Sequence, residues 1–167
     1  MIKTINIIIH FFLFFLIIVF NFEDVAEEIL IYADEISYDK NNNIIAKGNA
    51  KIISEDKIIL SDLIIYNQKK KEYTLPKEFS YKDEKNNYYY GSSAKFYNNL
   101  NKAFIEDIKL LLNDGSRIVG KSGIRDGNID LITKGSYSPC TSKIKIKNFI
   151  CPIWQLEGEK ILHDSEK

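Results

Sequence analysis

The stretch Ala33-Asp34-Glu35-Ile36-Ser37-Tyr38 is answered further along the chain by Ser61-Asp62-Leu63-Ile64-Ile65-Tyr66. In each copy the Asp, the Ile and the Tyr are two residues apart. Side chains at this spacing share one face of an extended chain, because successive residues of a strand point to opposite sides. The repeat therefore predicts two strands that present the same side chains to the same face.

The segment between the two copies predicts a third strand. From Ile44 to Ile52, apolar or small residues alternate with Lys47, Asn49 and Lys51, which is the pattern of a strand with one face on a core and the other in water. The turn before it, Asp39 to Asn43, contains Asp and Asn, whose side chains bond to nearby backbone and tolerate left-handed conformations.

Short β-rich runs separated by polar turns continue along the chain and predict an all-β fold. Asn101 to Leu112 has an alternative as a short helix, because several apolar residues also fall at helical spacing; we expect a strand because its neighbours are strands. A third, poorer echo of the repeat, Ser92 to Tyr97, places Lys95 where the first two copies have Ile. The expected strands are Ile29–Tyr38, Ile44–Ile53, Lys57–Tyr66, Glu72–Tyr81, Asn87–Tyr97, Lys102–Leu112, Ser116–Arg125 and Asn128–Thr133.

The N-terminus has the features of a secretory signal peptide. Lys3 supplies an early positive charge, and an unbroken apolar run extends from Phe11 to Phe20. This run is shorter than the roughly 20 residues that a membrane-spanning helix needs. We expect cleavage after Ala26, with retention of residues 1–26 as a membrane anchor as the alternative.

The charge balance argues against a nucleic-acid partner. The chain has 23 basic and 23 acidic residues and no arginine-rich face, whereas nucleic-acid-binding domains carry a basic patch. The residues after the predicted signal peptide are enough for one domain with its own core.

Residues that would carry chemistry are few, and we expect neither an enzyme nor a cofactor or metal site. His163 and Asp164 are adjacent, so on a strand they point to opposite faces, and no nucleophile is marked nearby. Cys140 and Cys151 lack the ligand spacing of a metal site. In an oxidising compartment they can form a local disulfide, or each can await a partner elsewhere.

Two motifs resemble a known family. Tyr137-Ser138-Pro139-Cys140, Cys151-Pro152-Ile153-Trp154-Gln155-Leu156 and Ile161-Leu162-His163-Asp164 resemble the segment that closes the N-terminal periplasmic domain of the lipopolysaccharide-assembly protein LptD. The Asp-x-Ile-x-Tyr repeat, with Ile45 to Ala50, resembles the OstA-like repeat shared by proteins of the lipopolysaccharide bridge.

The resemblance implies an OstA-like β-jellyroll, V-shaped in section, whose open apolar groove receives lipid acyl chains. It implies a periplasmic protein at the outer membrane that takes part in lipopolysaccharide transport, with lipopolysaccharide and a neighbouring periplasmic bridge jellyroll as partners; a separate outer-membrane barrel is a further candidate. If even-numbered residues of the early strands face the groove, its lining is Leu30, Ile36, Ile52, Leu60 and Ile64, with Tyr38 and Tyr66 near the rim.

The sequence departs from that family because LptD continues into a barrel, for which the given chain leaves no room. We expect a signal peptide at 1–26, the jellyroll at 27–134 and a closing segment at 135–167, in either a shortened or split LptD or a stand-alone carrier. With no barrel cysteine to compete, we expect a Cys140–Cys151 disulfide. The alternative functions are a structural or adhesive envelope domain with a filled core, and a membrane-anchored bridge component.

Overall fold

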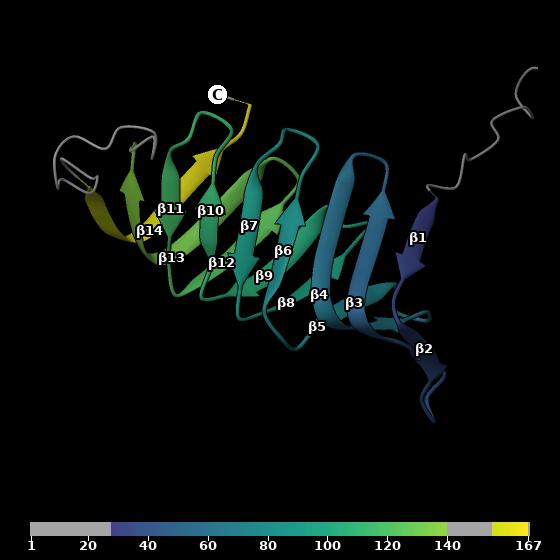
Figure 1. The fold of residues 1–167 in the computed structure, drawn as a ribbon. Helices are drawn as coiled ribbons and strands as arrows, with labels where there is room; N and C mark the ends of the chain where they lie inside the picture. The colour runs from purple at the N-terminus through teal and green to yellow at the C-terminus, as the bar shows by residue number, and fades with distance from the viewer. Residues whose placement is uncertain (1–27, 140–154, 167) are drawn as a thin grey trace, which may run out of the picture.

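The computed structural model describes residues 28–139 and 155–166, which form one antiparallel sheet of 14 strands. The sheet is folded over into two layers that face each other, with the N-terminal strands at one end and the C-terminal strand at the other (Figure 1). Among these residues no helix is long and apolar enough to span a membrane. The expected all-β fold is confirmed.

Strand bounds show how the two layers are built. The first layer contains β1, β6, β7, β10 and β11, the second contains β2, β5, β8, β9 and β12, and the long strands β3, β4, β13 and β14 run through both. The strands are β1 (Ile29–Tyr32), β2 (Glu35–Tyr38), β3 (Ile44–Ser54), β4 (Lys57–Asn67), β5 (Glu72–Leu75), β6 (Phe79–Lys82), β7 (Tyr88–Gly91), β8 (Ser93–Tyr97), β9 (Lys102–Glu106), β10 (Lys109–Leu111), β11 (Arg117–Val119), β12 (Ser122–Asp126), β13 (Ile129–Ser138) and β14 (Leu156–Asp164).

Several segments predicted as one strand are in fact two strands joined by a corner. The segment Ile29–Tyr38, for example, is β1 and β2, which both pair with β3 but lie in different layers. The same division separates β5 from β6, β7 from β8, β9 from β10, and β11 from β12. The helical alternative for Asn101 to Leu112 is wrong, because this segment forms β9 and β10.

The corners follow one another along a line where the sheet turns from one layer to the other, which we call the fold line. Backbone hydrogen bonds join successive corners along it. The Asp34 amide donates to the Gly48 carbonyl at 2.9 Å, and the Asp107 amide donates to the Lys121 carbonyl at 2.8 Å. Side chains reinforce these corners, since the Asp107 carboxylate accepts from Ser92 and from Lys121, each at 2.7 Å. These two contacts, that with Lys121 first, lower the pKa of Asp107.

The fold line also changes which residues point inward. On β4, Ile59 and Ser61 are buried before the corner, whereas Ile64 is buried after it, so the inward positions change from odd to even numbers. On β3, a bulge between Lys47 and Ala50 accompanies this change. A bulge inserts an extra residue and bends the strand, which lets a long strand serve both layers.

The segment Ser92 to Tyr97 follows the repeat in the structure, but shifted by one residue from the predicted register. In β8, Ala94 and Phe96 are buried and Lys95 points outward. Phe96 pairs with Tyr73, which pairs with Tyr66 of the second copy. Phe96 therefore occupies the Tyr position of the repeat.

The core lies between the layers and consists of rows of cross-strand neighbours. In the first layer one row joins Ile52, Ile59, Tyr81, Tyr89, Leu110 and Ile118, all buried. The facing row in the second layer includes Ala46, Ile64, Leu75, Ala94, Ile105 and Ile132. Alternation of these apolar residues with outward-facing ones explains why the early strands could be predicted.

Two strands at the C-terminal end extend beyond the predicted limits. The sequence placed a boundary between residues 134 and 135, but β13 runs through this position. β14, which was not predicted, pairs with β13 over most of its length. The described part of the closing segment is thus a strand of the same sheet. The predicted signal peptide, Cys140, Cys151 and Trp154 lie outside the described residues.

We predict that Gly91→Ala destabilises the protein by about 1–3 kcal/mol, because it overpacks the corner. A Cβ atom at Gly91 would lie 2.7 Å from the Glu106 carbonyl oxygen and 2.7 Å from Ile105 Cγ2. The same carbonyl accepts the Ser92 amide hydrogen bond. Urea denaturation would measure the loss.

The matched control is Gly158→Ala on β14, where the nearest atom would be 3.3 Å away. We expect this change to stay within about 0.5 kcal/mol. Equal stability of the two variants would contradict tight packing at the Gly91 corner.

Candidate functional site

The candidate site is the inner face of the fold at its N-terminal end. β3 lies between the two copies of the repeat, so that Ile36 and Ile64 both pair with the buried Ala46. Directly opposed residues of an antiparallel pair face the same side. The predicted groove residues that lie on the inner face are Ile36, Tyr38, Ile52, Ile64 and Tyr66.

The prediction that Leu30 and Leu60 point inward is wrong. Leu30 is 39% exposed, and its neighbours Ile29 and Ile31 are the residues that pack on the core. Leu60 is 46% exposed beside the fully buried Ile59. The even-numbered rule fails here because it assumed one continuous face, whereas the corner between the layers shifts the alternation by one residue.

Two of the inner-facing residues are open to solvent. Ile36 is 52% exposed and Tyr38 is 68% exposed, although both lie in rows that continue into the core. Further into the fold, Tyr66 stacks on Tyr73 with ring centroids 4.4 Å apart. The N-terminal end is therefore an apolar mouth, which we define by Ile36, Tyr38, Ile64 and Tyr66.

The interior behind this mouth is filled by aromatic side chains. Tyr81, Tyr89 and Phe96 are fully buried, and the rings of Tyr81 and Phe96 meet edge to face at 5.1 Å. Core packing of this kind leaves few voids larger than a water molecule. The space between the layers at the level of these three side chains is therefore filled.

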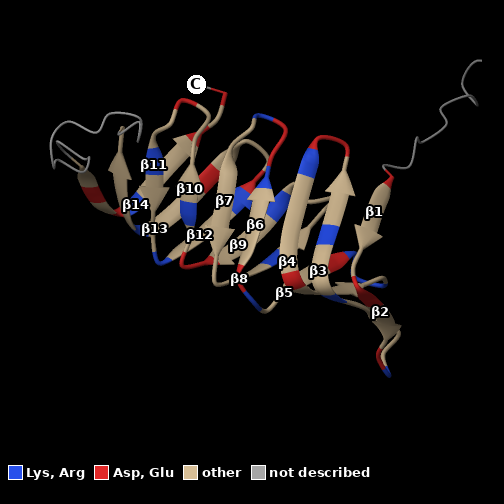
Figure 2. Cartoon of the chain, in the orientation of Figure 1, with Lys and Arg blue, Asp and Glu red and all other residues tan. Residues whose placement is uncertain are grey.

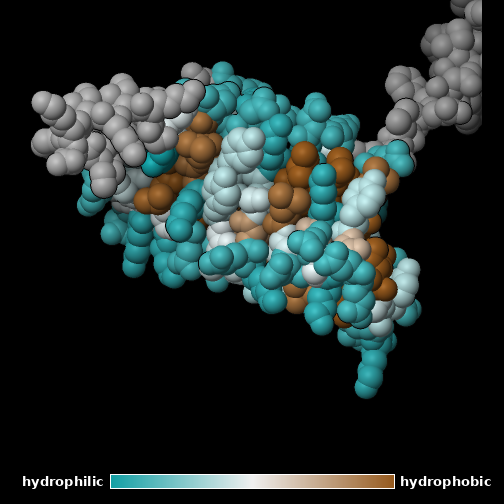
Figure 3. All heavy atoms as spheres, viewed as in Figure 1, coloured by the Kyte–Doolittle hydropathy of each residue, from teal (hydrophilic) through white to brown (hydrophobic). Residues whose placement is uncertain are grey.

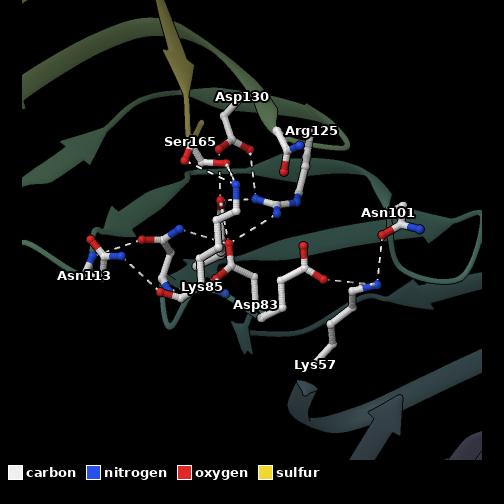
Figure 4. A network of polar contacts seen from close by, with 12 residues as sticks. Lys57, Asp83, Lys85, Asn101, Asn113, Arg125, Asp130 and Ser165 are labelled. Atoms are coloured by element: carbon white, nitrogen blue, oxygen red, sulfur yellow. Dashed lines mark hydrogen bonds and ion pairs between the residues drawn. The ribbon is translucent and has the colours of Figure 1, made fainter. Parts of the chain in front are cut away.

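A buried polar network joins the two layers along the side opposite the corners (Figure 4). Arg125 of β12 lies between Asp83, at 3.2 Å, and Asp130, at 3.4 Å. It also donates to the hydroxyl group of Tyr89, which itself donates to Asp130 at 2.9 Å. A second contact between the layers joins Lys57 to Asn101 at 2.9 Å.

The environment of the network determines the protonation of Tyr89. Burial, together with the negative charge of Asp130, raises the pKa of Tyr89 far above its ordinary value. The phenol therefore keeps its proton and remains a hydrogen-bond donor. Sequence reasoning missed this network, because its members are distant in sequence and only the isolated Arg125 within a strand hinted at it.

His163 belongs to the edge of the same network. Its Nδ1 atom lies 3.2 Å from Asp130, whereas Asp164 pairs across the strands with Ile129. The two adjacent residues thus point to opposite faces, as predicted. Among residues 28–139 and 155–166, no cluster of His, Cys, Asp and Glu side chains has the arrangement of a metal site.

A second opening lies at the C-terminal end, where an apolar pocket of about 400 Å³ opens beside β14. Ile118, Tyr137, Leu156 and Ile161 contribute to its lining. Its volume is within the range of small-molecule pockets. The inner row that begins at the N-terminal mouth thus ends in a second apolar opening.

Both ends of the fold also present strand edges. Within the part of the chain that the structure describes, β1 and β2 each pair with β3 alone, and β14 pairs with β13 alone. The free side of such a strand carries backbone donors and acceptors that another chain can bind. Leu156 and Leu162 of β14 are 59% and 68% exposed.

Comparison with known proteins supports the fold. No family model matches the sequence, and no curated protein matches it. A solved structure that matches is LptH from Pseudomonas aeruginosa, described as the LptA-homologous periplasmic component of the conserved lipopolysaccharide transport device. It aligns with a TM-score of 0.53 at 15% sequence identity, covering 62% of this chain and 78% of the LptH chain. The expected β-jellyroll is confirmed, while the closer assignment to LptD stays a prediction.

We predict that Arg125→Ala lowers the free energy of unfolding by about 3–5 kcal/mol, because it leaves two buried carboxylates without their positive partner. Lys102→Ala is the matched control, since it breaks the exposed ion pair between Lys102 and Asp126. The two side chains are 50% and 64% exposed, and we expect a loss below about 1 kcal/mol. Urea denaturation of both variants tests this, and similar losses would contradict a structural role for the network.

Proposed function

We propose that this protein is a non-catalytic component of lipopolysaccharide transport in the periplasm. In this proposal it holds acyl chains at the apolar ends of the jellyroll and docks with neighbouring jellyrolls through its edge strands. The observation that carries the proposal is the N-terminal mouth, where Ile36 and Tyr38 face inward yet remain half-exposed or more. The jellyroll fold shared with LptH supports it.

The mouth suits an acyl chain for a physical reason. Each methylene group moved from water to an apolar site contributes about 0.8 kcal/mol, so a few carbons of a chain lying on Ile36 and Tyr38 are enough for weak binding. The filled interior behind Tyr66 limits how far a chain can enter without separating the layers. We therefore propose shallow binding at the ends, with the sugars of the lipid outside.

The remaining parts of the proposal come from the sequence. The signal peptide at 1–26 would export the chain to the periplasm, where it would act near the outer membrane. The Pro-Cys and Trp-Gln motifs favour a relative of the N-terminal domain of LptD, with a Cys140–Cys151 bond and, as a further candidate partner, a separate barrel.

A second candidate function is a structural envelope domain that uses only its edges. The complete burial of Tyr81, Tyr89 and Phe96 favours this alternative, because such a centre is packed like that of any stable domain. Lipid contact at the inner-facing mouth distinguishes the two functions.

We predict that a photo-crosslinking amino acid at Ile36 captures lipopolysaccharide in intact cells. The matched control is the same amino acid at Ile124, which is exposed to a similar extent, 50% against 52%, but points outward from β12. Lipid captured at both positions or at neither would contradict binding at the mouth. Capture at neither position would favour the structural function.

We also predict that the edges mediate end-to-end association. Leu156→Lys together with Leu162→Lys places two charges on edge strand β14 and should weaken self-association by about tenfold or more. The control is Ile124→Lys, which adds an exposed charge to a strand paired on both sides. Sedimentation over a range of concentrations measures both variants, and equal weakening would rule out β14 as the docking edge.

A further inference from the structure

The outer face of the first layer is unusual in its charge. Among the outward-facing positions of β1, β6, β7, β10 and β11, and of the halves of β3 and β4 that lie with them, the charged residues are all basic: Lys51, Lys82, Lys109 and Arg117. One acidic residue, Glu157 of β14, faces outward at the C-terminal margin of this layer, opposite Ser136. In Figure 2 basic residues lie on these strands, while acidic residues lie at the turns and corners at the rims and on β14.

The same face exposes large apolar and aromatic side chains between its bases. Lys51 lies between Tyr32 and Leu60, and Lys82 lies beside Tyr88. These three apolar neighbours are between 38% and 52% exposed. Figure 3 shows hydrophobic side chains distributed over this face among more polar ones. The solvent face of an antiparallel sheet is ordinarily polar, so this composition calls for an explanation.

The outer face of the second layer differs, because it carries charges of both signs and some of them pair. Lys95 lies 3.5 Å from Glu72, and Lys102 lies 2.9 Å from Asp126. In the first layer, within residues 28–139 and 155–166, no ion pair involves Lys51, Lys82 or Arg117. The positive charge of the first layer is therefore available to a partner.

We propose that the outer face of the first layer docks on an anionic phospholipid bilayer. Basic side chains near such a surface are attracted to its negative charge, and tyrosine rings favour the level of the lipid headgroups. From Lys51 on β3 to Arg117 on β11 the bases extend across five strand spacings, roughly 24 Å. A charge distributed over this distance matches a bilayer better than a single phosphate group.

The docked orientation leaves the rest of the molecule free. The apolar mouth lies outside the docking face, because Ile36 belongs to β2 in the second layer and points inward. The free sides of β1 and β14 border the docking face at its two ends. Docking therefore does not depend on lipid held between the layers, and it can be tested separately from the proposed transport.

The test is co-sedimentation with vesicles of phosphatidylcholine containing about one-third phosphatidylglycerol. The protein used is residues 27–167, since every described strand pairing lies between Ile29 and Asp164 and the apolar N-terminal segment would bind vesicles by itself. We expect binding that weakens with salt and is absent with pure phosphatidylcholine. The triple variant Lys51→Glu, Lys82→Glu, Arg117→Glu should lose at least about tenfold in affinity.

The matched control is Lys47→Glu, Lys134→Glu, Lys160→Glu, which changes the net charge equally at exposed positions outside this face. A second variant, Lys51→Gln, Lys82→Gln, Arg117→Gln, should show an intermediate loss, and circular dichroism checks folding. Equal loss in the control, or no binding of the unmodified protein, would overturn the proposal. Binding only when lipopolysaccharide is present would overturn it in favour of recognition of that lipid.

Discussion

The fold depends on the line of corners along which the sheet turns from one layer to the other. At each corner the chain changes layers within one to three residues, and the backbone bonds from Asp34 to Gly48 and from Asp107 to Lys121 keep successive corners aligned. Because the alternation of side chains slips at this line, the corners also decide which residues meet inside. Ile59 and Ile64 can both be buried on β4 only because Asp62 and Leu63 lie between them at the turn. The corners thus define the interior as well as the shape.

The opposite side of the fold is held by charge and hydrogen bonding. Arg125, Asp83 and Asp130 are buried between the layers, and a buried ion pair of this kind stabilises little relative to apolar packing but is costly to break. Its role here is better understood as closure, since it joins the two layers where the corners cannot. Ile36 and Tyr38 remain exposed because they lie at the end of the fold, where β2 pairs, among the described residues, with β3 alone.

The local alternation of apolar and polar residues predicted the long strands well and the short strands poorly. β3 and β4 agree with the predicted bounds to within one residue, because alternation over a long segment is a strong signal. The corners at Ala33–Asp34 and Asp107–Ile108 contain no Gly or Pro, so nothing local separates β1 from β2 or β9 from β10. The inward direction of Leu30 and Leu60 was mispredicted for the same reason. The Arg125 network depends on contacts between residues that are about 40 positions apart in sequence, which no local pattern reveals.

Strands of the first layer have apolar residues at consecutive positions, and this places apolar side chains on both its inner and its outer face. Ile58-Ile59-Leu60 and Tyr88-Tyr89-Tyr90 have the composition of strands buried on both sides. In this fold the middle residue of each run is fully buried, while Leu60, Tyr88 and Tyr90 are 46%, 38% and 40% exposed. The second layer also exposes apolar side chains, such as Ile124 at 50%, but its outer face carries charges of both signs, with ion pairs such as that between Lys102 and Asp126. What is particular to the first layer is the excess of unpaired bases beside its apolar side chains, and a partner that offers both negative charge and an apolar interior accounts for the two together.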